Sequence, residues 1–129
     1  MSAVKLAREN WQGMLASVSV QLKENAEELS RMDAVTGDGD HGVTMRKIAR
    51  VIDDSLEQWP SHVPLKGFFE CLSSNIMAVN GGSAGPLWGT LFAGFARGMH
   101  GEEDIDEQGI VKMFTAGIDE MREITTAKA

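Results

Sequence analysis

The sequence predicts an all-α protein built as an antiparallel, up-and-down helical bundle. Apolar residues recur at helical spacing in five segments, and no run alternates with the period of a strand for long enough to predict a sheet. The connections between these segments are short, which makes consecutive helices antiparallel neighbours. The chain has 129 residues without an internal repeat or a linker, so we expect one domain over residues 1–129.

The first helical segment covers about residues 4–29. Its apolar stripe comprises Val4, Ala7, Trp11, Met14, Val18, Leu22, Ala26 and Leu29. This pattern fits one long helix or two helices with a break near Ser19. The following segment, Asp33 to Gly42, holds three glycines and three aspartates, and we expect a loop there because glycine adopts backbone conformations that other residues avoid.

Two further helices are expected over residues 43–58 and 64–79. In the first, the residues expected to point inward are Val43, Ile48, Ile52 and Leu56, and Trp59-Pro60 ends the helix. The second is rich in apolar residues and closes at Asn80. It contains the single cysteine, Cys71, which we expect to be a small core residue because nothing near it would activate a thiol.

The last two helices are expected over residues 87–99 and 106–124. Pro86 suits the first position of a helix, and the helix that follows it is apolar on nearly every side, so it should be buried. Gly89 and Gly94 within it are interpreted as packing residues. The final helix carries a stripe formed by Ile110, Met113, Phe114, Ile118 and Met121.

Composition and charge exclude several classes of partner. The net charge of −7 argues against non-specific binding to nucleic acid or to an anionic membrane. Residues 1–10 lack the apolar region of a signal peptide, and the longest apolar stretch, residues 84–99, is interrupted by glycines and Arg97. We therefore expect no membrane span and a cytoplasmic location, which also fits the single cysteine.

Three carboxylates, Asp33, Asp38 and Asp40, lie within eight residues of the expected loop. Their mutual repulsion favours a cation between them, and an all-oxygen ligand set suits Mg²⁺ or Ca²⁺. A calcium loop of the EF-hand type starting at Asp38 would require Gly at position 43 and Glu at position 49, where this chain has valine and alanine. The alternative is a solvated acidic turn whose aspartates cap the next helix.

His41 follows these carboxylates directly. It is a poor candidate for a magnesium ligand because the cation prefers oxygen donors. Either it caps or packs at the helix start, or it faces a phosphate or a nucleotide.

A second motif, Asn80-Gly-Gly-Ser-Ala-Gly-Pro86, opens onto the buried helix. Unpaired N–H groups at a helix start attract a phosphate, and Ser83 adds a hydroxyl donor. The motif matches neither the Walker A nor the Rossmann pattern, and a tight turn between helices is an equally good interpretation. An acidic protein that binds phosphate needs a positive charge, and a metal ion held by the first motif would supply it.

Together, the motifs Asp33-Ala-Val-Thr-Gly-Asp-Gly-Asp-His-Gly42 and Gly81-Gly-Ser-Ala-Gly-Pro-Leu-Trp-Gly-Thr90 resemble the nucleotide-binding L subunit, or L domain, of dihydroxyacetone kinases. The resemblance implies an antiparallel barrel of eight helices, of which about five would be present here. It implies that Asp33, Asp38 and Asp40 hold two Mg²⁺ ions. The implied contacts to ADP or ATP are His41, Gly42, Val43, Thr44, Gly82, Ser83 and Ala84.

The resemblance also implies a phosphotransferase whose activity depends on a partner. A separate K subunit would hold dihydroxyacetone or a similar small ketose, so no catalytic residue is assigned to this chain. A phosphotransferase-system protein would recharge the nucleotide in some relatives. The family's C-terminal third is not matched, so an incomplete barrel should expose an apolar face, for instance on the fourth helix, and self-associate. Alternatives are a non-catalytic regulatory module and an inactive structural fragment.

Overall fold

The computed structural model describes residues 5–36, 41–79, 84–99 and 104–126. The described helices are α1 (Arg8–Glu24), α2 (Ala26–Thr36), α3 (His41–Glu57), α4 (Leu65–Met77), α5 (Ala84–Arg97) and α6 (Glu107–Thr126). Two short strands, β1 (Lys5–Leu6) and β2 (Ile105–Asp106), pair in antiparallel register. The all-α prediction is confirmed, and this two-residue ladder is the only sheet among the described residues.

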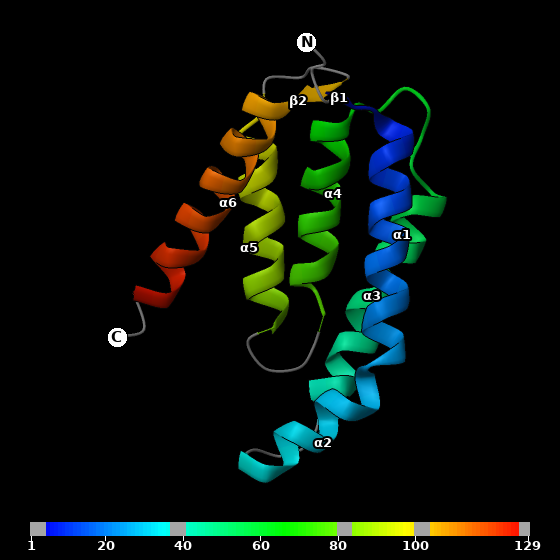
Figure 1. Cartoon of the computed structure of the whole chain (residues 1–129), viewed down its shortest axis with the longest axis vertical. Helices are drawn as coiled ribbons and strands as arrows, with labels where there is room; N and C mark the ends of the chain where they lie inside the picture. Colours follow the sequence, from blue (N-terminus) through cyan, green and yellow to red (C-terminus); the bar gives the residue numbers. More distant parts are fainter. Residues whose placement is uncertain (1–4, 37–40, 80–83, 100–103, 127–129) are drawn as a thin grey trace.

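Helices α3, α4, α5 and α6 lie side by side and alternate in direction (Figure 1). Helix α1 packs against α3, and α2 continues from α1 to pack along the same helix. The β1–β2 ladder joins the segment before α1 to the segment before α6, at the end of the bundle opposite α2. The expected up-and-down connectivity is thus present in the described part of the chain.

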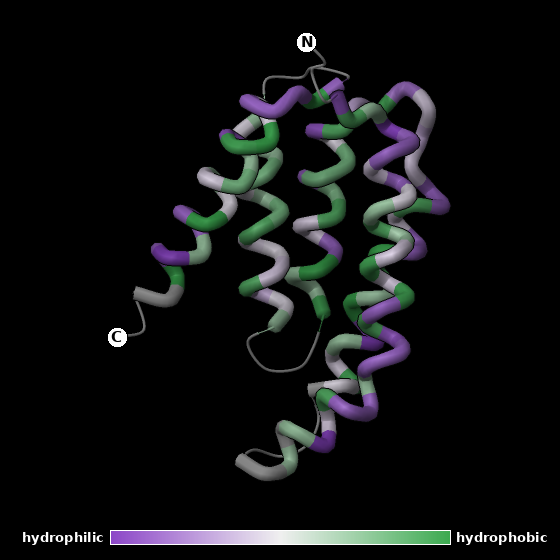
Figure 2. The backbone as a smooth tube through the Cα atoms, viewed as in Figure 1, coloured by the Kyte–Doolittle hydropathy of each residue, from purple (hydrophilic) through white to green (hydrophobic). Residues whose placement is uncertain are grey.

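The core is centred on the fully buried ring of Phe69 in α4. The rings of Trp11, Phe92 and Phe95 each lie 5.6 Å from it, so α1, α4 and α5 meet at one aromatic cluster. Ile48 adds a fully buried side chain from α3. Figure 2 shows the same distribution, with apolar residues concentrated along α4 and α5.

Glycines set the spacing of the helices on both sides of α5. A Cβ at Gly94 would overlap the backbone of Gly117 in α6, and a Cβ at Gly89 would lie 3.1 Å from the carbonyl oxygen of Ser73 in α4. The Ser73 hydroxyl donates to the Gly89 carbonyl over 2.7 Å. The prediction that Gly89 and Gly94 are packing residues is confirmed.

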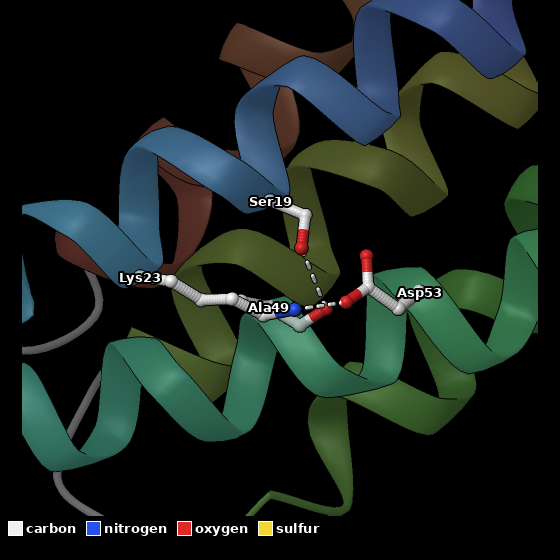
Figure 3. A network of polar contacts seen from close by, with 4 residues as sticks. All are labelled: Ser19, Lys23, Ala49 and Asp53. Carbon is white, nitrogen blue, oxygen red and sulfur yellow. Dashed lines mark hydrogen bonds and ion pairs between the residues drawn. The ribbon is translucent and has the colours of Figure 1, made fainter.

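Helices α1 and α3 are joined by two polar contacts (Figure 3). The hydroxyl of buried Ser19 donates to the Ala49 carbonyl over 3.2 Å, and Lys23 forms an ion pair with Asp53. Burial raises the pKa of Asp53, but the hydrogen bond and positive charge of Lys23, together with the nearby Ser19 hydroxyl, outweigh it, so the pKa lies below its ordinary value of 3.8.

Several expectations about the elements were wrong. The first helix breaks at Asn25 and not near Ser19, because the Asn25 side-chain amide donates to the Gln21 carbonyl over 2.8 Å and the backbone leaves the helical conformation. A loop was expected from Asp33 to Gly42, but residues 33–36 belong to α2 and residues 41–42 belong to α3. Pro86 is the third residue of α5, still within the first turn, where a missing N–H costs nothing.

Some inward positions were also misassigned. The side chain of Val43 is 48% exposed, and Cys71 is exposed on α4 instead of lying in the core. On α6, Phe114 and Ile118 are 44% and 45% exposed, although Met113 is fully buried as expected. In the described part of the chain, no helix combines the length and the apolar character that crossing a membrane requires.

Candidate functional site

The predicted site residues lie around the ends of three helices. Asp33 belongs to α2, His41 begins α3 and Ala84 begins α5. The other predicted ligands, Asp38, Asp40, Gly82 and Ser83, lie outside the described residues, as do the side chains of Asp33 and His41. The geometry of the site therefore rests on the helix ends that flank the two motifs.

Gly42 fixes the start of α3 against α2. Its N–H donates to the Ser30 hydroxyl oxygen over 2.9 Å, and a Cβ at this position would overlap the carbonyl oxygen of Ala26. Ala26 is fully buried at this contact. Only glycine fits there without moving α2, so this residue positions the helix that carries Asp33 relative to the helix that begins at His41.

The next two residues of α3 face opposite environments. Val43 is 48% exposed, whereas Thr44 is buried, at 4% exposure. Of these two predicted nucleotide contacts, Val43 therefore has the side chain that a bound molecule can reach. The Thr44 side chain is enclosed by the protein.

The start of α5 packs closely on the end of α4. Ala84 is buried, and a Cβ at Gly85 would lie 3.1 Å from the carbonyl oxygen of Ile76 and 3.2 Å from that of Val79. Val79 also lines a pocket together with Val43. The end of α4, the start of α5 and the start of α3 are therefore neighbours, at the lower end of the bundle in Figure 1.

Two helices thus direct their N-terminal ends to the same side of the molecule. Helix α3 has 17 residues and α5 has 14, and both begin at this end. Each helix start carries partial positive charge and N–H groups without intrahelical partners. An anion placed between them would be stabilised by both helices, which is the arrangement that suits a phosphate.

The metal assignment stays a prediction. Among the described residues, no group of three or more histidine, cysteine, aspartate or glutamate side chains has the geometry to hold a metal ion. The three aspartates proposed as ligands are outside that search, because two of them and the side chain of Asp33 are not described.

Sequence reasoning missed the residues that hold the site together. Ala26 and Ser30 are four positions apart, so they share one face of α2, and two small residues at that spacing could have indicated a close approach by another helix. The proximity of Val79 to Val43 has no local signal, because it depends on how α3 packs against α4.

Comparison with known proteins identifies relatives with kinase names. The profile of the DAK2 domain matches residues 35–129. The ADP-binding subunit DhaL of PEP-dependent dihydroxyacetone kinase 1 from Listeria innocua is 32% identical over 77% of this chain and 49% of its own length. L-erythrulose 1-kinase from Mycolicibacterium smegmatis is 34% identical over 74% of this chain and 17% of its own length. The ADP-binding subunit DhaL of PTS-dependent dihydroxyacetone kinase from Lactococcus lactis is 28% identical over 64% and 43%.

The chain spans about half the length of the Listeria subunit, 49%, and 43% of the Lactococcus subunit. Both predicted motifs fall within the DAK2 match, apart from Asp33 and Ala34. The match also covers α3, α4, α5 and α6, the four helices that form the row in Figure 1. Because the profile covers well over half of the sequence, the chain belongs to the DAK2 domain family.

Proposed function

We propose that this chain is the Mg-nucleotide-binding component of a kinase acting on dihydroxyacetone or a similar small ketose. The observation that carries the proposal is the meeting of the α3 and α5 starts, next to the end of α2, in a member of the DAK2 family. Two relatives are named as ADP-binding subunits, which supports ADP or ATP as the ligand. The phosphates would lie at the two helix starts.

The residues present suit this ligand. Asp33, Asp38 and Asp40 would hold Mg²⁺, two ions by the family resemblance, because their carboxylates are the hard oxygen donors that this cation prefers. The metal would neutralise phosphate oxygens in an otherwise acidic protein. Backbone N–H groups of Gly82, Ser83 and Ala84 would bind a phosphate. In the other motif, His41, Gly42, Val43 and Thr44 would contact the nucleotide, as the family resemblance implies; the side chain of Val43 is exposed there.

The acceptor ketose would be held by a separate K-type subunit. The relatives are described as PEP-dependent and PTS-dependent, so a phosphotransferase-system protein is a second candidate partner, as the donor that recharges ADP. The chain would then supply and orient the phosphoryl group, and the base for the ketose hydroxyl would belong to the partner. The alternatives are a regulatory module that binds nucleotide without transferring phosphate, and an inactive fragment.

Magnesium-dependent protection by ADP in a thermal melt tests nucleotide binding. We expect ADP with Mg²⁺ to raise the melting temperature by several degrees, and Asp38→Ala to abolish the increase while the helical circular dichroism spectrum is retained. Asp119→Ala, at an exposed position on α6, is the control for loss of one carboxylate. Unchanged protection of Asp38→Ala would show that this carboxylate is not a metal ligand.

Ketose phosphate formation separates the three functions. A mixture of the chain, a K-type subunit, dihydroxyacetone and MgATP should produce dihydroxyacetone phosphate if the chain donates the phosphoryl group. Nucleotide binding without product would favour the regulatory module. Absence of both would favour the inactive fragment.

We also propose that the chain self-associates through α6. The exposed apolar residues of this helix are Val111, Phe114 and Ile118, with exposures of 64%, 44% and 45%. The fourth expected helix, now α5, was the wrong candidate for this face, because neighbouring helices bury most of it. The spacing of three and then four residues aligns the exposed side chains on one stripe of α6 that a second copy would cover.

A further inference from the structure

Ser30 is a residue of α2 whose hydroxyl reaches the start of α3. Its oxygen accepts the N–H of Gly42 over 2.9 Å, in a partly buried contact. The first N–H groups of a helix have no intrahelical partners, and the usual cap is a side chain just before the helix. Here the hydroxyl comes from the preceding helix, twelve positions earlier in the chain. The start of α3 is therefore held in part by α2.

The hydrogen bond belongs to one stripe of α2, and this stripe includes the position of Asp33. Ala26, Ser30 and Asp33 are spaced by four and then three residues, so their positions lie on the same side of the helix. Ala26 is fully buried against Gly42, and Ser30 is partly buried. Met32, on another side of α2, is 61% exposed. The side of α2 that packs on the start of α3 is thus the side on which the predicted metal ligand occurs.

Two contacts one turn apart orient this stripe. The carbonyl oxygen of Ala26 lies so close to Gly42 that no Cβ fits between them, and one turn later the Ser30 hydroxyl bonds to the N–H of the same glycine. The first contact sets how near the helices lie. The second is directional, so it also restrains the rotation of α2 about its own axis. Asp33 follows Ser30 by about 4.5 Å along the helix, so a rotation of α2 would displace it.

An ion pair between the same two helices restrains α2 less. Glu27 and Arg46 are 3.8 Å apart, and their side chains are 82% and 50% exposed. An exposed pair at this distance contributes little, because water screens the charges and both side chains keep their freedom. The Ser30 hydrogen bond is shorter and partly buried. The hydroxyl is therefore well placed to fix the orientation of α2.

The other two predicted metal ligands precede α3 in the sequence. Asp38 and Asp40 come four and two positions before Gly42, whereas Asp33 belongs to α2. A cation shared by the three carboxylates would depend on how α2 is oriented relative to the start of α3. Mg²⁺ demands near-ideal octahedral geometry with short bonds to oxygen, so a small displacement of one carboxylate weakens its binding.

We propose that Ser30 is a positioning residue for the cation: its hydroxyl orients α2 so that Asp33 can share a metal ion with Asp38 and Asp40. Ser30 itself is not a ligand, because its oxygen is engaged by the N–H of Gly42. The inference rests on the proposed function, since those aspartates are the proposed magnesium ligands. Groups that orient metal ligands in this way typically contribute about 10–100-fold to metal affinity.

Ser30→Thr and Ser30→Val are the matched pair that tests the hydroxyl. Their side chains have nearly the same shape, and only threonine keeps the hydroxyl. Mn²⁺, which accepts the same oxygen donors, is titrated into each variant without nucleotide, and the free ion is measured by electron paramagnetic resonance. Only the binding that Asp38→Ala abolishes is counted. We expect Ser30→Val to weaken this binding about tenfold or more, and Ser30→Thr to stay within about threefold of the unmodified chain.

Ser17→Val is the control for loss of a serine hydroxyl, at an exposed position of α1, and should not change Mn²⁺ binding. A merely structural role of Ser30 predicts that Ser30→Val melts at a lower temperature than Ser30→Thr while both bind Mn²⁺ equally. That result would overturn the inference. Loss of the helical spectrum in Ser30→Val alone would overturn it too, because the hydroxyl would then serve the fold. If both branched variants unfold, Ser30→Ala is judged against the unmodified chain by the same criteria.

The ADP melt is measured on the same proteins, so the two proposals fail separately. Absence of ADP protection in the unmodified chain would overturn nucleotide binding, while the Mn²⁺ titrations still decide the role of Ser30. Retained ADP protection with equal Mn²⁺ affinities of the matched pair would overturn only the role of Ser30. Absence of Mn²⁺ binding that depends on Asp38 in the unmodified chain would overturn the inference together with the metal assignment.

Discussion

At the scale of single residues, Gly94 determines how closely α5 approaches α6. A methyl group there would overlap the backbone of Gly117, which has no flexible side chain to move aside. We expect Gly94→Ala to lower the free energy of unfolding by about 1–3 kcal/mol, the usual range for an overpacked core. Urea denaturation followed by circular dichroism measures this change.

Gly13→Ala is the matched control for that substitution. Gly13 lies inside α1, is exposed, and has no atom near its missing Cβ. Alanine there should raise the free energy of unfolding by about 0.5–1 kcal/mol, because it restricts the unfolded chain and favours the helix. Equal effects of the two substitutions would contradict the close α5–α6 contact.

The ion pair of Asp53 predicts a pH dependence of stability. Because the folded pKa lies below the ordinary value of 3.8, the stabilisation is complete above that value and is lost as the pH falls through the folded pKa. We expect Asp53→Asn to melt at a lower temperature than the unmodified chain at pH 6, and the difference to shrink below about pH 4. Thermal melts of both proteins across this pH range measure the effect. A difference in melting temperature that did not change with pH would refute the prediction.

The sequence predicts the burial of single residues well at the centre of a helix's apolar stripe and poorly at the edges of that stripe. Ile48 and Ile52, four positions apart, are both fully buried as expected. Val43 precedes Ile48 by five positions, which turns it away from that stripe by more than a quarter of a turn, and it is exposed. Cys71 lies between buried Phe69 and Leu72 in sequence but on another face of α4.

At the scale of the elements, the contact between α2 and α3 is the part of the site most open to test. Gly42→Ala would push α3 away from Ala26 and disturb the hydrogen bond to Ser30. We expect it to reduce magnesium-dependent protection by ADP while the helical spectrum is largely retained. The thermal melt used for Asp38→Ala measures this effect, and full protection of Gly42→Ala would show that the α2–α3 angle is unimportant for binding.

The helices were predictable as elements because their apolar periodicity is strong, but their ends were not. Asn25 ends α1 through its own side chain, and α2 continues to Thr36 into a stretch whose glycines predicted a loop from Asp33. The two motifs could be located from their glycines and aspartates alone. The nearness of Val43 to Val79 depends on tertiary packing, which no local pattern reports.

At the scale of the whole molecule, α6 lies at one edge of the row of described helices (Figure 1), and it carries exposed apolar side chains. Val111 and Ile118 are seven positions apart on α6, so they lie on the same side, and both are exposed. Covering them with the same stripe of a second copy would remove apolar surface from water in both chains. The folded state would then be favoured by association, and its stability would depend on protein concentration.

We therefore expect the melting temperature of the unmodified chain to rise with protein concentration, and Val111→Glu to remove this dependence. A charge at the centre of a self-complementary interface faces its own copy across the two-fold axis, so each dimer would bury two like charges. Ser17→Glu, which adds the same charge at an exposed position of α1, should leave the dependence intact. Sedimentation velocity at several concentrations provides an independent measurement. The opposite outcome is that the unmodified chain sediments as a monomer at every concentration and melts at a constant temperature. That result would show that copies of this chain do not cover α6.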